Sequence, residues 1–214
     1  IVSGIGGGEQ VGEGLENFFN NTTSKVLIFG VGPTPGGNPY VGPVGVLVTP
    51  AVGSCLVQGL RIYTANDTEG RDPTDYSIQG SADGNTYVPI SSGSLSLPGG
   101  RNGGGASLNP VTQNVYEVLF ANQTWYPHYR IIFNNVKDPD NVNSMQIAEM
   151  ELLGNFTPKL TIERNPTNGE MTVRTNRVGL LQSSFTLTET EPMWADVNTI
   201  NPANPFVRMP THAE

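Results

Sequence analysis

The chain of 214 residues has little cysteine, little positive charge and no long apolar run. Because Cys55 is its only cysteine, no disulfide can form within the chain, and stability must come from core packing, a metal or assembly. We interpret Cys55 as a small buried residue rather than a reactive or intermolecular thiol. No Lys, Arg or His stands beside it in the sequence to stabilise a thiolate.

The charge balance and the hydropathy exclude two classes of partner. Eleven Lys and Arg against 19 Asp and Glu give a formal net charge of -8, so phosphate backbones would be repelled and we expect no nucleic acid partner. No segment approaches about 18 consecutive apolar residues, so we expect no membrane insertion. The chain starts at Ile1 without a basic and apolar leader, which is typical of a mature product whose leader was removed.

The residues that are abundant favour strands. With 26 Gly, 17 Pro and only 14% charged residues, the composition favours turns and strands over helices, and we expect an all-β protein. Apolar residues alternate with polar ones at Leu60 and Ile62 and again at Tyr76 and Ile78, which is the period of half-buried strands. The Asp-Gly pair in the turn 81–85 then predicts a β-hairpin that returns over residues 87–90.

The pattern along the chain divides it into three parts. Residues 1–14 are Gly-rich and are expected to be a mobile arm or one that orders only against a partner. Residues 15–156 hold most of the predicted strands, and the Gly-rich run 98–105 among them is expected to be an exposed excursion. After Gly154 to Pro158 the pattern restarts, and residues 157–214 are expected to form a second, small β module.

Three segments, 64–87 (TANDTEGRDPTDYSIQGSADGNTY), 129–136 (YRIIFNNV) and 143–154 (NSMQIAEMELLG), carry a resemblance. In this order they resemble the discoidin, or coagulation-factor C-type, branch of the galactose-binding-like β-sandwiches, in the version found in secreted and surface proteins of Gram-negative bacteria. The resemblance covers roughly residues 8–155 and implies a galactose-binding-like jelly-roll β-sandwich in an extracellular protein. Residues 157–214 resemble the small immunoglobulin-like or fibronectin-like module that often ends such proteins.

The sequence gives little support to catalysis. The two histidines, His128 and His212, fall in different predicted domains, so a pairing with a Ser or Cys nucleophile is not expected. Carboxylates are scattered over turns and strand ends, and no Gly-rich run is followed by the Lys-Ser/Thr of a phosphate-binding loop. We therefore expect a protein that is not an enzyme.

Two groups of residues are candidates for ligand binding. In the loop 66–72, Arg71 with Asp67 or Asp72 offers a donor fork and acceptors to sugar hydroxyls; alternatively, Arg71 pairs internally and only holds the loop. Aromatic and polar side chains outside the predicted strands provide surfaces for a sugar ring. These are Tyr40, Trp125 and Tyr126, with His128 nearby, and a Trp before a strand can equally be a lid on the core.

The resemblance also implies a structural Ca²⁺ between an early loop and a Glu on the last strand. Here the early loop is 19–24 and the late acid is Glu149, so the ligands would be Asn21, Ser24 and Glu149. Phe19 stands where the family usually has Asp, which removes one carboxylate from the set. The alternative is a loop held by hydrogen bonds alone.

Two functions follow from these features. The first is a non-catalytic extracellular binding or adhesion protein that recognises carbohydrate or another surface polymer through the sandwich loops. The second is a self-assembling structural subunit of a filament, sheath or surface layer, whose arm adds a strand to a neighbour's sheet edge. The resemblance favours the first, whereas the arm and the small final module favour the second.

Overall fold

In the computed structural model, the described residues are 2–32, 37–156, 160–175, 179–183, 195–200, 203 and 206–208. The chain divides into two compact units, unit 1 (Ile1–Phe156) and unit 2 (Thr157–Glu214). Across the described ranges the regular structure consists of strands and two short 3-10 helices, η1 (Leu15–Phe19) and η2 (Glu69–Arg71), without an α-helix. The all-β prediction is confirmed.

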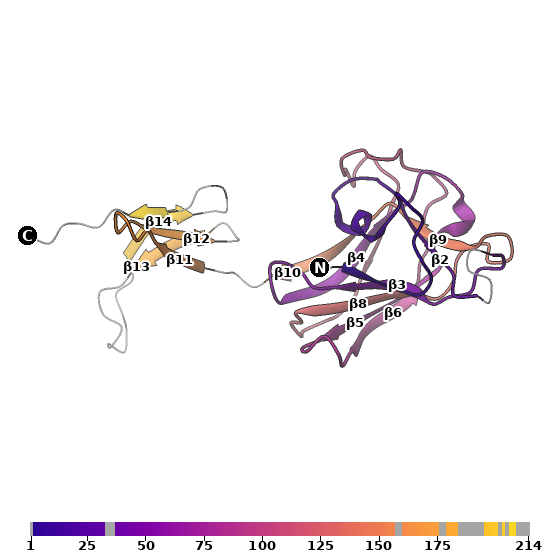
Figure 1. The fold of residues 1–214 in the computed structure, drawn as a ribbon, viewed down its shortest axis with the longest axis horizontal. Helices are drawn as coiled ribbons and strands as arrows, with labels where there is room; N and C mark the ends of the chain where they lie inside the picture. The colour runs from indigo at the N-terminus through magenta and orange to yellow at the C-terminus, as the bar shows by residue number, and fades with distance from the viewer. Residues whose placement is uncertain are drawn as a thin grey trace, which may run out of the picture. The chain divides into compact units, whose positions relative to one another are not determined.

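Unit 1 contains one large antiparallel sheet (Figure 1). Its strands in spatial order are β1 (Val2–Ile5), β3 (Val44–Val48), β8 (His128–Phe133), β5 (Asp75–Ser81) and β6 (Val88–Ser94). Side chains that point into the core lie opposite one another on neighbouring strands of this sheet. Ile131 pairs with Val46 on one side and with Ile78 on the other, and all three are fully buried.

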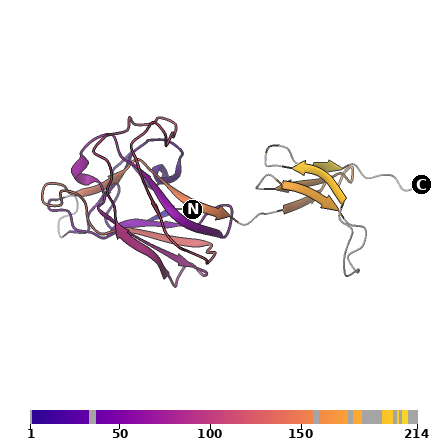
Figure 2. The ribbon, with the colours of Figure 1, turned by 180° about the vertical axis from the view of Figure 1, so that it is seen from behind.

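The facing layer is built from two smaller antiparallel sheets (Figure 2). One has the order β10 (Glu149–Phe156), β4 (Cys55–Tyr63) and β7 (Val115–Leu119); the other pairs β2 (Val26–Phe29) with β9 (Ser144–Ile147). Leu60 and Ile62 of β4, whose alternation predicted a strand, are both fully buried. Together the layers enclose one hydrophobic core, as the period-two pattern requires.

The predicted hairpin is present. β5 and β6 are antiparallel neighbours, and Gly84 in their connection has a φ of +74°, which glycine adopts without steric cost. The return strand is longer than predicted and starts later, at Val88 rather than at Tyr87.

The N-terminal segment differs from the expected arm. Val2–Ile5 pairs antiparallel with β3, from Val2 opposite Val48 to Ile5 opposite Gly45. The backbone then stays attached, because the Phe29 N–H donates to the Gly8 carbonyl at 2.9 Å. The segment therefore finds its partner strand in its own chain, which satisfies its backbone groups without a neighbour.

The Gly-rich excursion 98–105 is mostly exposed, as expected, but one of its residues is anchored within the protein. Leu95 and Leu97 just before it are buried in the core, and Asn102 within it is only 5% exposed. The Asn102 amide donates to the Thr64 carbonyl and to the Asn114 carbonyl, each at 2.9 Å. One polar side chain thus fixes a segment that has few side chains of its own.

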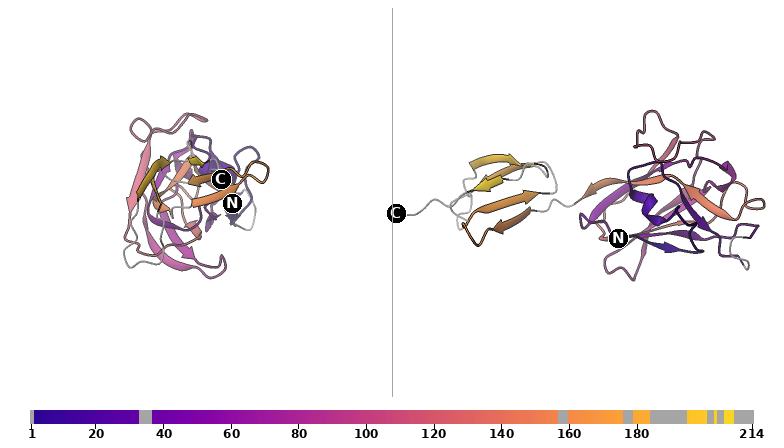
Figure 3. Two further views of the ribbon diagram at one scale, coloured as in Figure 1. Left: turned by 90° about the vertical axis from the view of Figure 1, so that its left-hand side faces the viewer. Right: turned by 45° about the horizontal axis from the view of Figure 1, so that its top comes forward.

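The strand register defines two ends of the sandwich of unit 1. At the first, which we call the hairpin end, lie the connections 49–54, 82–87 and 120–127, because β3 and β5 end there and β4, β6 and β8 begin there. At the other, which we call the long-loop end, lie the connections 37–43, 64–74, 95–114 and 134–143. Figure 3 gives two further views of these strands and their connections.

Unit 2 is also made of strands. β11 (Leu160–Arg164), β12 (Met171–Thr175) and β15 (Phe206–Arg208) form one antiparallel sheet, and β13 (Gly179–Ser183) pairs with β14 (Ala195–Ile200). The immunoglobulin-like or fibronectin-like topology of this unit stays a prediction. His212 lies outside the described residues.

Candidate functional site

The loop 120–127 at the hairpin end carries two of the predicted aromatic residues and is fixed at its base. Asn122 is 9% exposed, and its amide nitrogen donates to the Val57 carbonyl at 2.9 Å and to the Thr124 carbonyl at 3.1 Å. Its amide oxygen accepts the Thr124 N–H at 2.9 Å. The loop is therefore a fixed feature of the surface rather than a free connection.

Tyr126 lies on the inner side of this loop. Its backbone exchanges hydrogen bonds with Cys55, at 2.9 and 3.0 Å, and its ring meets Tyr129 edge to face with the centroids 6.1 Å apart. The ring also covers Gly80, where a Cβ atom would lie 2.2 Å from the Tyr126 ring. Tyr126 is therefore a lid on the core, and glycine at position 80 is what lets the ring approach.

Trp125 takes the opposite orientation. Tyr126 packs against the core, whereas the side chain of Trp125 is accessible to solvent. It is 43% exposed. An exposed indole on an anchored loop is a surface on which the C–H face of a sugar ring can pack.

His128 begins β8 next to this loop. It is half-buried, and its Nδ1 lies 2.9 Å from the Thr49 hydroxyl oxygen. Its ring also borders the hairpin turn, since a Cβ atom on Gly84 would lie 3.6 Å from the imidazole. His128 thus joins all three connections of the hairpin end and has a fixed orientation.

Arg130 follows on the same outward side of β8, because β8 alternates between half-buried and buried residues. Its guanidinium carbon lies 4.6 Å from the centroid of the Tyr87 ring, and its Nε donates to the Gln79 side-chain oxygen at 2.9 Å. Arg130 has no ion pair within the described residues, whereas four other cations of unit 1 have one: Lys25, Arg61, Arg101 and Lys137. A stacked, oriented guanidinium without a carboxylate partner is available to acceptor oxygens of a ligand.

Sequence reasoning missed Arg130 and Tyr87 as site residues. The available pattern was a single charge inside the otherwise apolar strand YRIIF, together with an aromatic residue directly after the turn. Neither feature indicates a site until the strand register places β5 between β6 and β8.

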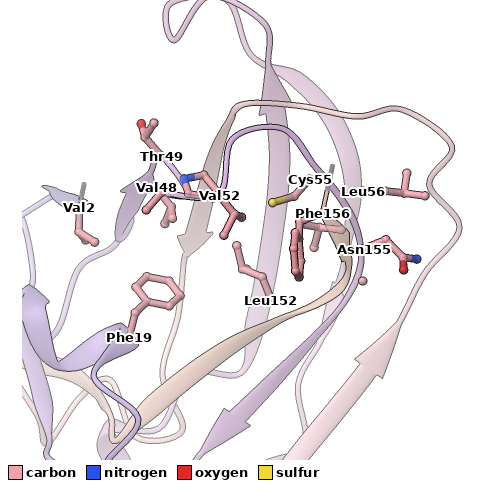
Figure 4. A pocket seen from close by; sticks show the side chains of 14 residues that line it. Val2, Phe19, Val48, Thr49, Val52, Cys55, Leu56, Leu152, Asn155 and Phe156 are labelled. Carbon is pink, nitrogen blue, oxygen red and sulfur yellow. The ribbon is translucent and has the colours of Figure 1, made fainter. Parts of the chain in front are cut away.

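A pocket of about 490 Å³ lies at the hairpin end between the edges of the two layers. In Figure 4 the rings of Phe19 and Phe156 lie on opposite sides of it, with Leu152 between them. Cys55 lines the same pocket, and burial raises the pKa of its thiol, so a stabilised thiolate is not supported there. This lining suits apolar groups better than sugar hydroxyls.

Tyr40 does not present its ring as the sequence analysis expected. It lies at the long-loop end, is only 5% exposed and belongs to the hydrophobic core. Burial, with a smaller effect of the charge on Asp75, raises the pKa of its hydroxyl. Tyr40 therefore has no exposed ring face for a sugar, and its role is in packing.

The expected pairing of Arg71 is also corrected. Asp67 pairs with Lys25 at 2.9 Å, and Asp72 pairs with Arg101 at 2.7 Å. Within the described residues, the buried Nε of Arg71 has no hydrogen-bond partner. Among the described residues no ion pair joins Arg71 to Asp67 or Asp72, so neither alternative, the ligand-binding fork or the internal pairing with these acids, is formed; both acids pair with cations from distant segments.

The six predicted ligand residues consequently do not form one site. Three lie at or next to the hairpin end, namely Trp125, Tyr126 and His128, and three lie at the long-loop end, namely Tyr40, Asp67 and Arg71. The hairpin end also brings in Arg130 and Tyr87, and we take it as the candidate binding surface.

The residues expected to hold calcium are brought together but do not fit the ion. Glu149 is 2% exposed, and its Oε2 accepts the backbone N–H of Asn20 at 3.0 Å. Burial raises the pKa of Glu149 to about 7, against the backbone amides of Asn20, Thr22 and Asn21, which lower it. The loop thus directs the N–H donor of Asn20 at the carboxylate, where a cation would require oxygen atoms.

The described residues hold no group of three or more His, Cys, Asp or Glu side chains placed to bind a metal. In the same ranges, no helix is long and apolar enough to cross a membrane.

No protein-family model and no curated protein sequence matches the chain. Solved structures do match its fold. CBM32-3 from a family 31 glycoside hydrolase of Clostridium perfringens has a TM-score of 0.52 at 13% identity, over 72% of this chain and 88% of that one. The family 32 carbohydrate-binding module of Clostridium perfringens NanJ, in complex with galactose, has a TM-score of 0.50 at 13% identity, over 70% of this chain and 90% of that one. The predicted fold of unit 1 is therefore confirmed as a discoidin-like, galactose-binding-like β-sandwich of the kind seen in family 32 carbohydrate-binding modules.

Proposed function

We propose that unit 1 is a non-catalytic extracellular module that binds carbohydrate at its hairpin end. The observation that carries the proposal is the exposed indole of Trp125 on a loop fixed by Asn122 and Tyr126. A sugar would pack its C–H face on this indole and direct its hydroxyls to polar neighbours. The fold supports the proposal, since the NanJ module with this fold is in complex with galactose.

Two polar side chains would set the orientation of the sugar. His128 is held by Thr49, and Arg130 is held by Gln79 and stacked on Tyr87. Because these contacts within the protein already fix both side chains, little side-chain entropy would be lost when a sugar binds. Arg130 would donate hydrogen bonds to either hydroxyl or carboxylate oxygens, so neutral and acidic sugars are both to be screened.

The test is a glycan array probed with the full chain, followed by calorimetry on the glycans that bind. Trp125→Ala should weaken binding at least about tenfold, as expected for an aromatic contact that carries much of the binding energy. Arg130→Gln should also weaken it. Val111→Ala is the matched control, because Val111 is 90% exposed and lies at the long-loop end. Equal affinity of Trp125→Ala and the parent chain would refute the site, and release of reducing sugar would refute the non-catalytic role.

One observation favours the second candidate, self-assembly. Leu160 and Ile162 alternate on β11 of unit 2 and are 54% and 59% exposed. A partner surface that covers them would remove apolar area from water. Size-exclusion chromatography of the parent chain and of the Leu160→Ser, Ile162→Ser variant tests this candidate, since an assembly that depends on β11 would fall apart in the variant.

A further inference from the structure

The loop that follows η1 is built around the carboxylate of Glu149. The Asn20 N–H donates to this carboxylate at 3.0 Å. Asn20 has φ of -102° and ψ of 4°, and Asn21 has φ of +59°. A residue in the bridge region followed by a left-handed one forms a turn that directs successive N–H groups to the same side, which makes a small anion-binding concavity.

The side-chain oxygens of this loop are already used within it. The Asn20 amide oxygen accepts the Thr22 N–H at 2.9 Å and the Thr22 hydroxyl at 2.7 Å. The Ser24 hydroxyl oxygen accepts the Thr22 hydroxyl at 2.9 Å. Ca²⁺ takes six to eight oxygen ligands, mostly carboxylates and carbonyls. A cation here would have to displace these hydrogen bonds. It would also face the partial positive charge of the Asn20 N–H.

Phe19 occupies the position at which the resemblance expects an Asp, so the candidate calcium site lacks a second carboxylate. Its side chain lines the apolar pocket together with Val2 and Leu152, and it packs on the outside of the core (Figure 4). The position at which the resemblance expects an acid thus contributes to apolar packing in this chain.

We propose that the turn formed by residues 20–22, through the N–H of Asn20, holds Glu149 in place of a divalent cation, so that the sandwich of unit 1 folds and keeps its long-loop end without calcium. The neighbouring Thr23 extends the effect. Its N–H donates to the Ala106 carbonyl at 2.8 Å, and its hydroxyl accepts the Ala106 N–H at 2.9 Å. The Thr23 hydroxyl also donates to the Gly103 carbonyl, so this loop anchors the Gly-rich segment 98–105 as well.

The first test compares the thermal unfolding of the full chain in excess EDTA and in millimolar CaCl₂. We expect the two melting temperatures to agree within about 1 °C, because a ligand that does not bind the native state cannot stabilise it. Calorimetric titration with Ca²⁺ should show no saturable heat. A calcium-dependent rise of more than about 5 °C, with saturable binding, would overturn the proposal.

The second test separates the backbone of Asn21 from its side chain. Asn21→Gly removes the side-chain amide but keeps the left-handed backbone, so we expect its melting temperature to stay close to that of the parent chain. Asn21→Val disfavours that backbone, and we expect its melting temperature to fall in both buffers. If the melting temperature fell equally in Asn21→Gly and Asn21→Val, and calcium raised both by the same amount, the result would show that side-chain bonding holds the loop rather than the amide concavity. If calcium stabilised the parent chain but not Asn21→Gly, a metal site would be demonstrated instead.

Discussion

Both terminal guanidinium nitrogens of Arg101 donate to the carboxylate of Asp72, each at 2.7 Å, across 29 residues of sequence. The Asp72 side chain is fully buried, and Lys137 also reaches it at 3.1 Å. This pair joins the Gly-rich segment 98–105 to the loop 64–74. The charge of Asp72 is therefore compensated by two cations from different loops of the long-loop end.

The first prediction concerns this pair. Arg101→Ala should lower the free energy of unfolding of unit 1 by about 2 kcal/mol, less than the 3–5 kcal/mol typical of a broken buried pair, because Lys137 still reaches Asp72. Urea denaturation of the full chain, monitored through a signal from unit 1, measures this change in the free energy of unfolding. Arg101→Met combined with Asp72→Asn should recover part of the loss, since no unpaired charge is then buried. An unchanged urea midpoint for Arg101→Ala would show that the pair contributes nothing.

The second prediction concerns the N-terminal strand. Deleting residues 1–5 removes β1 from the edge of β3, which uncovers Val48 and the pocket wall. We expect the free energy of unfolding to fall by about 1–3 kcal/mol, the cost of exposing one or two apolar side chains. Size-exclusion chromatography of the same variant also tests the assembly candidate. If β1 pairs only within its own chain, the deletion variant should elute at the same oligomeric state as the parent chain. Loss of a polymer with undiminished stability would favour an arm that pairs with a neighbour.

A third prediction uses the close approach of Tyr126 to Gly80. In Gly80→Ala the added Cβ would lie 2.2 Å from the Tyr126 ring, so the ring must move and carry the loop of Trp125 with it. We expect a stability loss of about 1–3 kcal/mol and weaker glycan binding. Gly103→Ala is the control, because a Cβ there has no atom within 4 Å. Full glycan affinity in Gly80→Ala would argue that the position of this loop does not matter for binding.

A fourth prediction concerns the turn of the hairpin. Hydrogen bonds from the Thr86 N–H, the Asn85 N–H and the Ser81 hydroxyl lower the pKa of Asp83 to about 2. A carboxyl whose folded-state pKa is lowered stabilises the fold above its unfolded value of 3.8, and this contribution is lost as the pH falls toward 2. The difference in melting temperature between the parent chain and Asp83→Asn should therefore be largest near neutral pH and shrink below about pH 4. A difference that is constant from pH 7 to pH 2.5 would show that the charge of Asp83 has no role.

Much of the fold of unit 1 follows from local pattern. The alternation at Leu60, Ile62, Tyr76 and Ile78 places these side chains in the core, and the Asp-Gly turn places the hairpin. Both depend only on residues close in sequence, since a strand alternates whatever it faces. Less of the candidate site was predictable: Trp125 stands just before a strand in the sequence and is exposed, but its binding of a ligand stays a prediction.

The amino-acid sequence by itself determined the strands, their inward faces and the acidic, disulfide-free character of the chain. Only the tertiary structure decided that Asp72 pairs with Arg101 instead of Arg71, that Tyr40 is buried, that Val2–Ile5 finds its own β3 and that Arg130 stacks on Tyr87. Each of these contacts joins segments far apart in the chain or depends on how a loop folds over the core. Strand order and packing therefore decide which of several chemically equivalent partners each residue contacts. No local pattern of residues contains that information.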